Sequence, residues 1–147
     1  MTLGDSYRQE PVRLHNGTVL AAALLPGLAP YYAGDLSGCR GASFEPVKAS
    51  LAEAQCALEK AGRALELSPG DSGELQLIHR ELSWSAAMLA LGADIAEKRY
   101  GEGSSATPRN AETRWEALRR EYIELWHARS RPGGLKESLS ELDPLAR

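Results

Sequence analysis

Groups that bind metals or form disulfides are scarce in this sequence. It has two cysteines in 147 residues, Cys39 and Cys56, which lie far apart and form no CxxC pair. No histidine stands near either of them at the spacing of a zinc site, so we expect no metal and no cofactor. Two cysteines are also too few for the disulfide framework of a small secreted scaffold. We therefore expect two free thiols in a reducing compartment.

Long apolar runs and a dominant charge are absent as well. No stretch approaches the ~18 consecutive apolar residues of a membrane span. The short apolar run at 19–25 follows a long start that contains Asp5 and Glu10, whereas a signal peptide begins with a short basic region. The net charge is −3 with both signs interspersed, which does not favour nucleic-acid binding. These absences predict a cytoplasmic protein that binds neither membrane nor nucleic acid.

Catalytic motifs are missing too. The sequence contains no G-x-S-x-G, P-loop, H-E-x-x-H or G-x-G-x-x-G motif. His79 stands beside Arg80 and Glu81, a pattern typical of a solvated helix surface, and Glu74 is poorly spaced to share its face. Catalysis needs converging groups, so the sequence does not favour a free-standing enzyme.

Proline and glycine, which interrupt helices and strands, are frequent in the first 42 residues. Their density there forbids a long helix. Only 18–25 could form a helix, which Asn16 could cap and Pro26 would end. The pattern predicts an irregular connector over 1–42 with one short helix. Such a connector must pack against another part of the protein.

Helical periodicity begins after the connector. The first long helix is predicted after Ser43, with a length of about 24 residues, and Ser68, Pro69 and Gly70 end it. Pro46 stands in its first turn, where the missing N–H is harmless. Its apolar positions alternate in spacing between four and three residues: Val47, Leu51, Ala54, Leu58, Ala61 and Leu65. Such a stripe packs against one neighbouring surface.

A second helix is predicted from Asp71 or Ser72 to about Tyr100, and it carries two apolar seams. One seam consists of Leu75, Ile78, Leu82 and Leu89, and the other consists of Trp84, Met88, Leu91 and Ile95. Two seams make a broad apolar surface, so we expect this helix to be central and covered on two sides.

The third helix is predicted from Thr107, a favourable N-cap followed by Pro108, to about Ser130. A short fourth helix is predicted over 135–142. Short links favour antiparallel neighbours. The sequence therefore predicts an all-α fold: an antiparallel bundle of three long helices plus a short C-terminal helix, which forms a domain over 43–147 behind the connector.

The tryptophans allow two interpretations. Trp115 and Trp126 are nearly three helical turns apart and so point in nearly the same direction. A core stripe explains this spacing, and so does an aromatic platform for a sugar or a partner protein. Trp126 is the better candidate for a platform, because it stands near the helix end. Trp84 lies on the second seam and is predicted to be part of the core.

The stretch WHARSRPGGLKES (126–138) ends the third helix. Pro132 disfavours helical geometry at the residue before it. Gly133 and Gly134 permit a sharp reversal of the chain. These three residues predict a structural corner.

Two arginines accompany this corner. Arg129 and Arg131 lie where the helix dipole favours cations, but a corner needs only one cation. Arginine also makes bidentate contacts with carboxylates. We therefore predict that Trp126, Arg129 and Arg131 form a docking or binding site at which one of the arginines contacts a neighbouring domain or subunit.

The segment LWHARSRPGGLKES (125–138) resembles a stretch near the C-terminus of bacterial family 20 glycoside hydrolases of the β-N-acetylhexosaminidase type. There a helical region follows the catalytic barrel, and LGDSYR…LHNGTVL (3–20) is similar to the segment that leaves that barrel. The family's catalytic groups are an adjacent Asp-Glu pair in the barrel, where the acetamido group of the substrate is the nucleophile. This sequence has no adjacent Asp-Glu pair and no alternation of strands and helices that could build a barrel.

The resemblance therefore implies an accessory or interaction domain, or a gene fragment, of such a carbohydrate-metabolising hydrolase. Its partner would be the catalytic barrel or a second copy of the chain, with an N-acetylhexosaminide at a shared site. The alternative is an independent helical module that binds a protein or a small ligand. The connector discriminates between them, because it should fold onto the bundle only in the independent module, whereas a missing barrel should leave a large apolar patch exposed.

Overall fold

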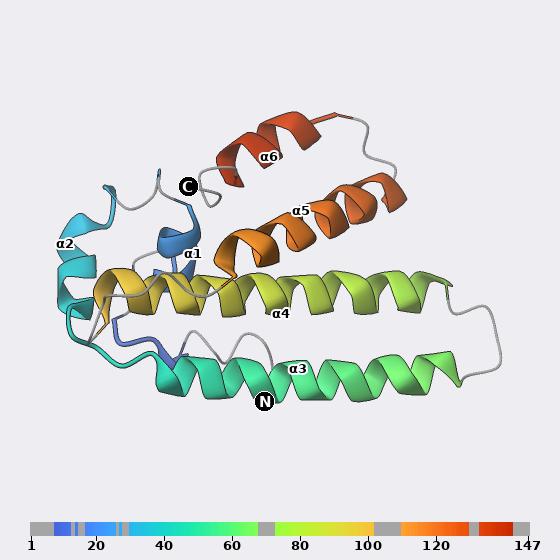
Figure 1. Ribbon diagram of the computed structural model, residues 1–147, viewed down its shortest axis with the longest axis horizontal. Coiled ribbons are helices and arrows are strands. Elements are labelled where there is room, and N and C mark those ends of the chain that lie inside the picture. The colour runs from blue at the N-terminus through green and yellow to red at the C-terminus, as the bar shows by residue number, and fades with distance from the viewer. Residues whose placement is uncertain are drawn as a thin grey trace.

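The computed structural model of the chain consists of α-helices (Figure 1). It describes residues 8–12, 14, 17–25, 27, 30–67, 73–101, 110–129 and 133–142. The helices are α1 (Val19–Leu24), α2 (Ala33–Leu36), α3 (Glu45–Glu66), α4 (Gly73–Tyr100), α5 (Ala111–Ala128) and α6 (Leu135–Leu142), with a 3-10 turn, η2 (Ser37–Cys39), after α2. The long helices α3, α4 and α5 pack together. The predicted all-α bundle with a short C-terminal helix is therefore confirmed.

The central helix is α4. The chain reverses its direction from α3 to α4 and again from α4 to α5 (Figure 1). Contacts join α4 to α3, to α5 and to the short helix α1. The predicted central position of this helix is confirmed, and its third neighbour, α1, uses part of its broad apolar surface.

The boundaries of the long helices lie close to those predicted, with a difference at α5. Pro46 stands in the first turn of α3, as expected. Helix α5 begins directly after Asn110, whose φ of 71° is left-handed. A right-handed helix does not continue through such a residue, so the prediction of a helix running on from Pro108 is wrong at Asn110. The predicted starting residues Asp71, Ser72, Thr107 and Pro108 lie outside the described residues.

Helix α1 is short and depends on hydrogen bonds at its N-terminus. The Thr18 hydroxyl oxygen accepts a hydrogen bond from the Ala21 N–H at 3.0 Å, as an N-cap does. The Glu10 carboxylate accepts one from the Val19 N–H at 2.8 Å. Burial raises the pKa of Glu10, against the opposing effect of hydrogen bonds from the backbone of Val19 and Leu20. These contacts satisfy N–H groups that have no partner within the helix.

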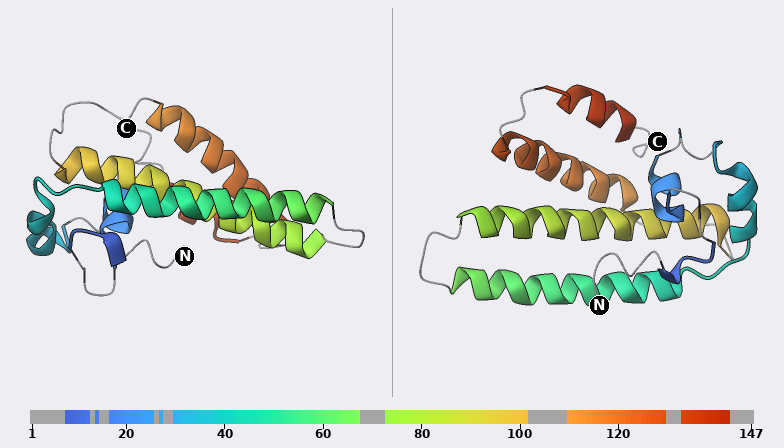
Figure 2. Two further views of the ribbon diagram at one scale, coloured as in Figure 1. Left: turned by 90° about the horizontal axis from the view of Figure 1, so that it is seen from below. Right: turned by 180° about the vertical axis from the view of Figure 1, so that it is seen from behind.

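Helix α1 lies against the C-terminal half of α4 (Figure 2). Gly92 permits the close approach, because a Cβ there would lie 3.0 Å from the Leu24 side chain and 3.3 Å from the Leu20 carbonyl oxygen. One core cluster combines side chains from both sides of residue 42, including Leu20, Phe44, Val47, Leu51 and Ala93. The described part of the connector thus folds onto the bundle, which is the arrangement expected of an independent module.

A second core cluster joins α4 and α5 around Trp115. Its other buried members are Leu24, Met88 and Leu91, and Trp115 is 1% exposed. The core interpretation of Trp115 is therefore confirmed. Trp84 is only partly buried beside this cluster, and its indole N–H donates a hydrogen bond to the Leu118 carbonyl oxygen at 2.8 Å.

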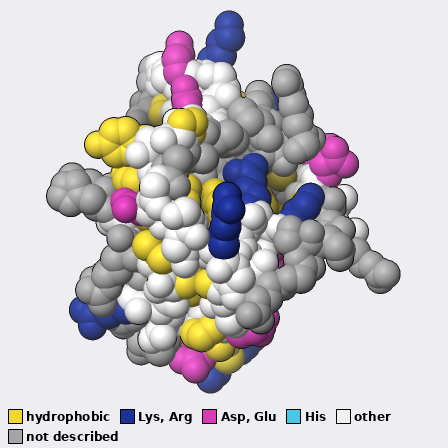
Figure 3. All heavy atoms as spheres, turned by 90° about the vertical axis from the view of Figure 1, so that its left-hand side faces the viewer, with side chains coloured by type: hydrophobic (Ala, Val, Ile, Leu, Met, Phe, Trp, Pro, Cys, Tyr) yellow, Lys and Arg dark blue, Asp and Glu magenta, His cyan; other side chains and the backbone are white. Residues whose placement is uncertain are grey.

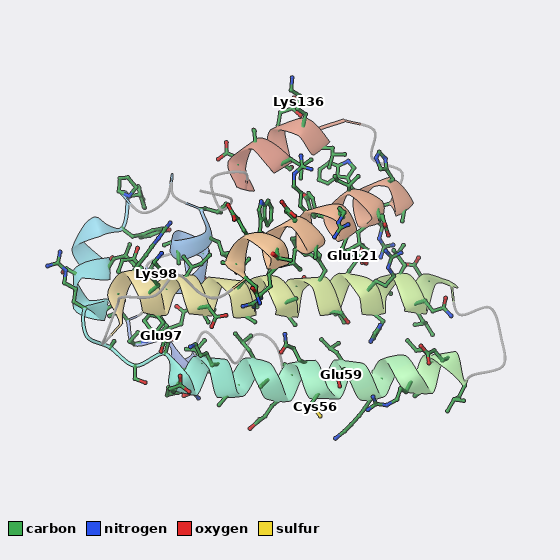
Figure 4. The ribbon with its side chains drawn as sticks, in the orientation of Figure 1. Cys56, Glu59, Glu97, Lys98, Glu121 and Lys136 are labelled. Carbon is green, nitrogen blue, oxygen red and sulfur yellow. The ribbon has the colours of Figure 1, made fainter. Side chains whose placement is uncertain are left out.

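Ion pairs connect the three long helices near the C-terminal half of α4. Lys48 of α3 contacts Glu97 and also Asp94, the latter at 3.4 Å. Asp94 accepts a second contact from Arg114 of α5 at 2.5 Å. Partial burial opposes the charge of Lys48, but its hydrogen bonds with Glu97 and Asp94 and their negative charges together raise its pKa. Figure 4 shows Glu97 between α4 and α3.

The N-terminal half of the first α4 seam is exposed. Leu75, Ile78 and Leu82 were expected to be covered, but their exposed fractions are 55%, 39% and 44%. Ala61 of the predicted α3 stripe is exposed as well. The reason is that α1 has six residues and covers only the other half of this face.

None of the described helices combines the length and apolar character that crossing a membrane requires. The end of the molecule that carries α2 faces the viewer in Figure 3. On this end the described hydrophobic side chains form small separate groups, and several lysine and arginine side chains stand near the middle of the view.

Candidate functional site

A cleft between α4 and α5 is the candidate functional site. Its volume is about 340 Å³. Both helices contribute side chains to it: Glu81, Trp84, Ser85, Tyr122, Leu125, Trp126 and Arg129. Two of the three predicted site residues, Trp126 and Arg129, therefore line one cleft, and the third, Arg131, lies outside the described residues.

Three aromatic rings form one wall of the cleft. Trp84 stacks on Tyr122 with ring centroids 5.0 Å apart and planes 29° apart. Tyr122 meets Trp126 at 5.6 Å with planes tilted by 59°. Offset and tilted arrangements are favourable for aromatic pairs. Because the Trp84 indole N–H is also held by a carbonyl oxygen, the wall is fixed at one end.

Arg129 forms the charged edge of the cleft. Its Nε and Nη2 donate hydrogen bonds to both carboxylate oxygens of Glu81, at 2.7 and 2.6 Å, and its Nη1 donates to Glu74 at 2.7 Å. The hydrogen bonds to Glu81 and Glu74 raise the pKa of Arg129 above its ordinary value. A guanidinium suits this bidentate geometry, which a lysine could not reproduce. Arg129 thus connects the end of α5 to the first half of α4.

A second arginine makes a similar connection nearby. Arg80 donates hydrogen bonds to Glu121 and Glu124 of α5, both at 2.8 Å. The hydrogen bond to Glu121 is the main reason that the pKa of Arg80 is raised. Figure 4 places Glu121 between α5 and α4. Each of the two arginines faces two carboxylates, so these contacts leave an excess of negative charge around the cleft.

The corner after α5 folds back toward Trp126. Gly134 has a φ of 83°, and a Cβ at this position would lie 3.5 Å from the Trp126 ring. The Gly134 carbonyl oxygen accepts a hydrogen bond from the Ser138 N–H at 2.9 Å, which starts α6. A Cβ at Gly133 would meet no atom within 4 Å. Pro132, the other predicted corner residue, lies outside the described residues.

The described residues do not assemble a reactive group in or beside the cleft. No cluster of three histidine, cysteine, aspartate or glutamate side chains in the described ranges could hold a metal ion. The Nε2 atom of His79 lies 2.7 Å from the Leu58 carbonyl oxygen, and its ring packs against Gly62. This histidine therefore connects α4 to α3, and what the cleft offers is binding by aromatic and charged side chains.

Sequence reasoning did not identify three important residues of the site. Tyr122 completes the aromatic wall, and its spacing of four residues from Trp126 places both on one face of α5. Glu74 and Glu81 hold Arg129, and their spacing of two turns puts them on one side of α4. These intervals were available in the sequence, but the pairing of Arg129 with them depends on how α5 crosses α4.

Comparisons with known proteins found no relative of this chain. No protein-family model matches it, and neither a curated protein nor a solved structure is significantly similar. The chain is therefore assigned to no family on this basis.

Proposed function

We propose that the chain is a helical interaction domain that docks a partner protein at the cleft between α4 and α5. The observation that carries this proposal is the combination of Trp126, Tyr122 and Arg129 around one open hollow. Tryptophan, tyrosine and arginine are the residues most enriched at the energetic centres of protein interfaces. The described residues that line the cleft also form no converging catalytic set, which favours binding over catalysis.

The chemistry of the cleft favours a specific kind of contact. Leu125, which is 5% exposed, lines the hollow together with the aromatic wall, so an apolar side chain of the partner would be desolvated there. The carboxylates that surround Arg80 and Arg129 outnumber the two arginines. A partner that places a basic side chain beside its apolar anchor would complement this charge.

The resemblance of segment 125–138 suggests the partner. In the proposal the chain is a module that folds independently, because its connector lies on its own bundle, and its partner is the catalytic barrel of a glycoside hydrolase of the β-N-acetylhexosaminidase type. The catalytic Asp-Glu pair would belong to the barrel, and this chain would contribute assembly. Gly134, in the corner that carries the resemblance, lies beside the cleft, since a Cβ at this position would lie 3.5 Å from the Trp126 ring.

Binding to an isolated barrel tests the proposal. The purified chain would be titrated against the catalytic barrel of a bacterial family 20 enzyme prepared without its own C-terminal helices, by biolayer interferometry. We expect saturable binding that Trp126→Ala weakens about tenfold or more. Tyr31→Ala is the matched control, because Tyr31 is an aromatic residue with 79% exposure outside the cleft. Absence of binding, or equal binding by Trp126→Ala and the control, would contradict the proposal.

An activity assay gives an independent check. The chain alone should not hydrolyse a chromogenic N-acetylglucosaminide, because its described residues show no group in a catalytic arrangement. Clear turnover by the pure chain that persists through a second purification step would refute the assignment of a non-catalytic role.

The same cleft favours one alternative, a small-ligand site. The tilted rings of Tyr122 and Trp126 could stack on a sugar face, and Glu81 and Arg129 could bind its hydroxyl groups. Titration with N-acetylglucosamine, monitored by tryptophan fluorescence, distinguishes this function. A saturable change that is lost in Tyr122→Ala would favour it, and an unchanged spectrum would exclude this ligand.

A further inference from the structure

The face of α4 that holds α1 continues along the helix without a cover. Leu89 packs against the core cluster beside α1. Leu82, Ile78 and Leu75 follow toward the N-terminus at spacings of seven, four and three residues, so they lie on the same side of α4. All three are exposed large hydrophobic residues.

Helix α3 also has a side that changes along its length from buried to exposed. Ser50 and Ala54 are buried, with exposed fractions of 5% and 6%. Ala57, Ala61 and Ala64 continue the same line at spacings of three and four residues, and all three are exposed. Both helices of the hairpin therefore have one side that is covered near α1 and uncovered near the α3–α4 link.

We call this uncovered side the open face. It consists of Ala57, Ala61 and Ala64 of α3 and of Leu75, Ile78 and Leu82 of α4. Its alanines would let another backbone approach α3 closely. Its leucine and isoleucine positions keep the alternating three and four spacing of a seam between two helices. An uncharged surface with this spacing fits an apolar helix and offers little to a polar ligand.

We infer that the open face binds the open face of a second copy of this chain, with the two α4 helices antiparallel. The interaction goes beyond the proposed docking at the cleft and uses a different surface. The position of α1 determines the direction. In a parallel pair the two α1 helices would occupy the same end of the interface and collide. In an antiparallel pair each α1 lies beyond the α3–α4 link of the other copy.

The spacing agrees with this arrangement, and the charge repulsion across it is reduced within each copy. An antiparallel seam pairs positions of the two heptad types, so Ile78 of each copy would meet Leu82 of the other. Glu74 and Glu81 flank the α4 part of the open face and would repel their equivalents across a two-fold axis. Arg129 of the same copy pairs with both of them and reduces that repulsion. The apolar positions of the two copies would therefore alternate along the seam, and Arg129 limits the repulsion beside it.

The size of the open face predicts a weak dimer. It spans about three turns of two adjacent helices, which corresponds to roughly 18 Å by 20 Å. Such a contact buries on the order of 800 Å² over both copies, less than a standard stable interface. We therefore expect a dissociation constant in the micromolar range rather than an obligate dimer.

Sedimentation velocity of the full chain tests the inference over protein concentrations from low to high micromolar. The weight-average mass should rise from 15.9 kDa toward twice that value. Ile78→Glu should raise the dissociation constant about tenfold or more, because it buries an unpaired carboxylate in the seam. Leu67→Glu is the matched control, since Leu67 is 84% exposed but lies off the spacing of the open face.

Ala61→Glu provides a second variant on the other helix, in case Ile78→Glu disturbs folding, and circular dichroism checks both. It should abolish the concentration dependence while leaving the helical signal intact. A wild-type mass that stays at 15.9 kDa at every concentration would overturn the inference. The inference would also be overturned if Ala61→Glu and Ile78→Glu both fold and dimerise as strongly as Leu67→Glu. None of these outcomes depends on binding at the cleft.

Discussion

The two halves of the α3–α4 hairpin have similar sequences of apolar and polar residues but different surroundings. Near α1 their shared side is part of the core, and Leu20, Leu51 and Ala93 there are almost fully buried. Near the α3–α4 link the same side is the open face, and Ile78 and Leu82 contact solvent. The comparison shows that helical periodicity identifies an apolar side, whereas burial of that side depends on whether another segment covers it.

The halves also differ in what holds them to their neighbours. The half near α1 is held by packing and by the Glu10 and Thr18 contacts that start α1. The other half is held to α5 by Arg129, whose partners Glu74 and Glu81 lie in the first turns of α4. Four measurements test this difference, beginning with the one expected to have the largest effect.

Leu20→Ala and Leu82→Ala compare the same deletion in the two halves. Leu20 is 1% exposed and Leu82 is 44% exposed. Leu20→Ala should lower the free energy of unfolding by about 2–5 kcal/mol, because it leaves a cavity in a packed core. Leu82→Ala should change it by less than about 1 kcal/mol. Urea denaturation at low protein concentration measures both, and equal losses would show that the open face is covered in solution.

Arg129→Ala tests the charged connection of the half near the link. This variant should lower the midpoint of thermal unfolding, but by less than Leu20→Ala lowers it. The difference from the wild type should shrink at high salt, because the contacts of Arg129 are partly exposed to solvent. Arg129→Lys should restore only part of the loss, since an ammonium cannot make the bidentate contact. Arg120→Ala removes a cation from the exposed side of the same helix and is the control. A loss as large in that control would argue against a specific role of Arg129.

Glu10→Gln tests the half near α1 through its pH dependence. The pKa of Glu10 is raised above its ordinary value of 4.5, so its folded state favours the protonated form. The stabilisation linked to this proton is present below pH 4.5 and is lost as the pH rises through the folded pKa. The variant should therefore gain stability relative to the wild type over that rise.

Chemical denaturation at several pH values between 4 and 8 measures this difference. This range begins below the ordinary glutamate pKa of 4.5 and extends above it, which is the side to which the pKa of Glu10 is raised. Glu53→Gln, on the exposed side of α3, controls for the loss of one negative charge. A difference between Glu10→Gln and the wild type that does not vary with pH would contradict the assignment of a raised pKa.

The two free cysteines report on the halves without changing stability. Cys39 is buried beside α1, where burial and the charge of Glu10 raise the pKa of its thiol. Cys56 is exposed on the outer side of α3 (Figure 4). A thiol reagent should label Cys56 at once and Cys39 only on unfolding. In Leu20→Ala the labelling of Cys39 should become faster, and unchanged protection would indicate that α1 does not cover it.

Much of the fold followed from the pattern of residues. The alternating spacing that starts at Val47 predicted α3, and the two seams predicted that α4 is central. The short helix at 18–25 was also expected, and it is α1. These predictions succeed because a helix is a local structure in which residues three and four apart share a side. The start of α5 was placed wrongly, since favourable capping residues do not determine the conformation of Asn110.

The candidate site could be predicted only in part. Trp126 and Arg129 were identified from their position at a helix end that has more arginine than a corner requires. That Arg129 pairs with Glu74 and Glu81, and that Tyr122 joins Trp126 to Trp84, could not be read from spacing. Those contacts join residues on two helices, and they depend on the position at which α5 crosses α4.

By itself the sequence determined the helices, the apolar side of each and the turn at Gly133 and Gly134, because these depend on interactions between near neighbours in the chain. The tertiary structure decided which part of an apolar side is core and which part is open face. The physical reason is that α1 has six residues and covers only half of this side of α4. It also decided that the surplus arginine at the corner faces two carboxylates of its own chain, at the edge of the cleft between α4 and α5.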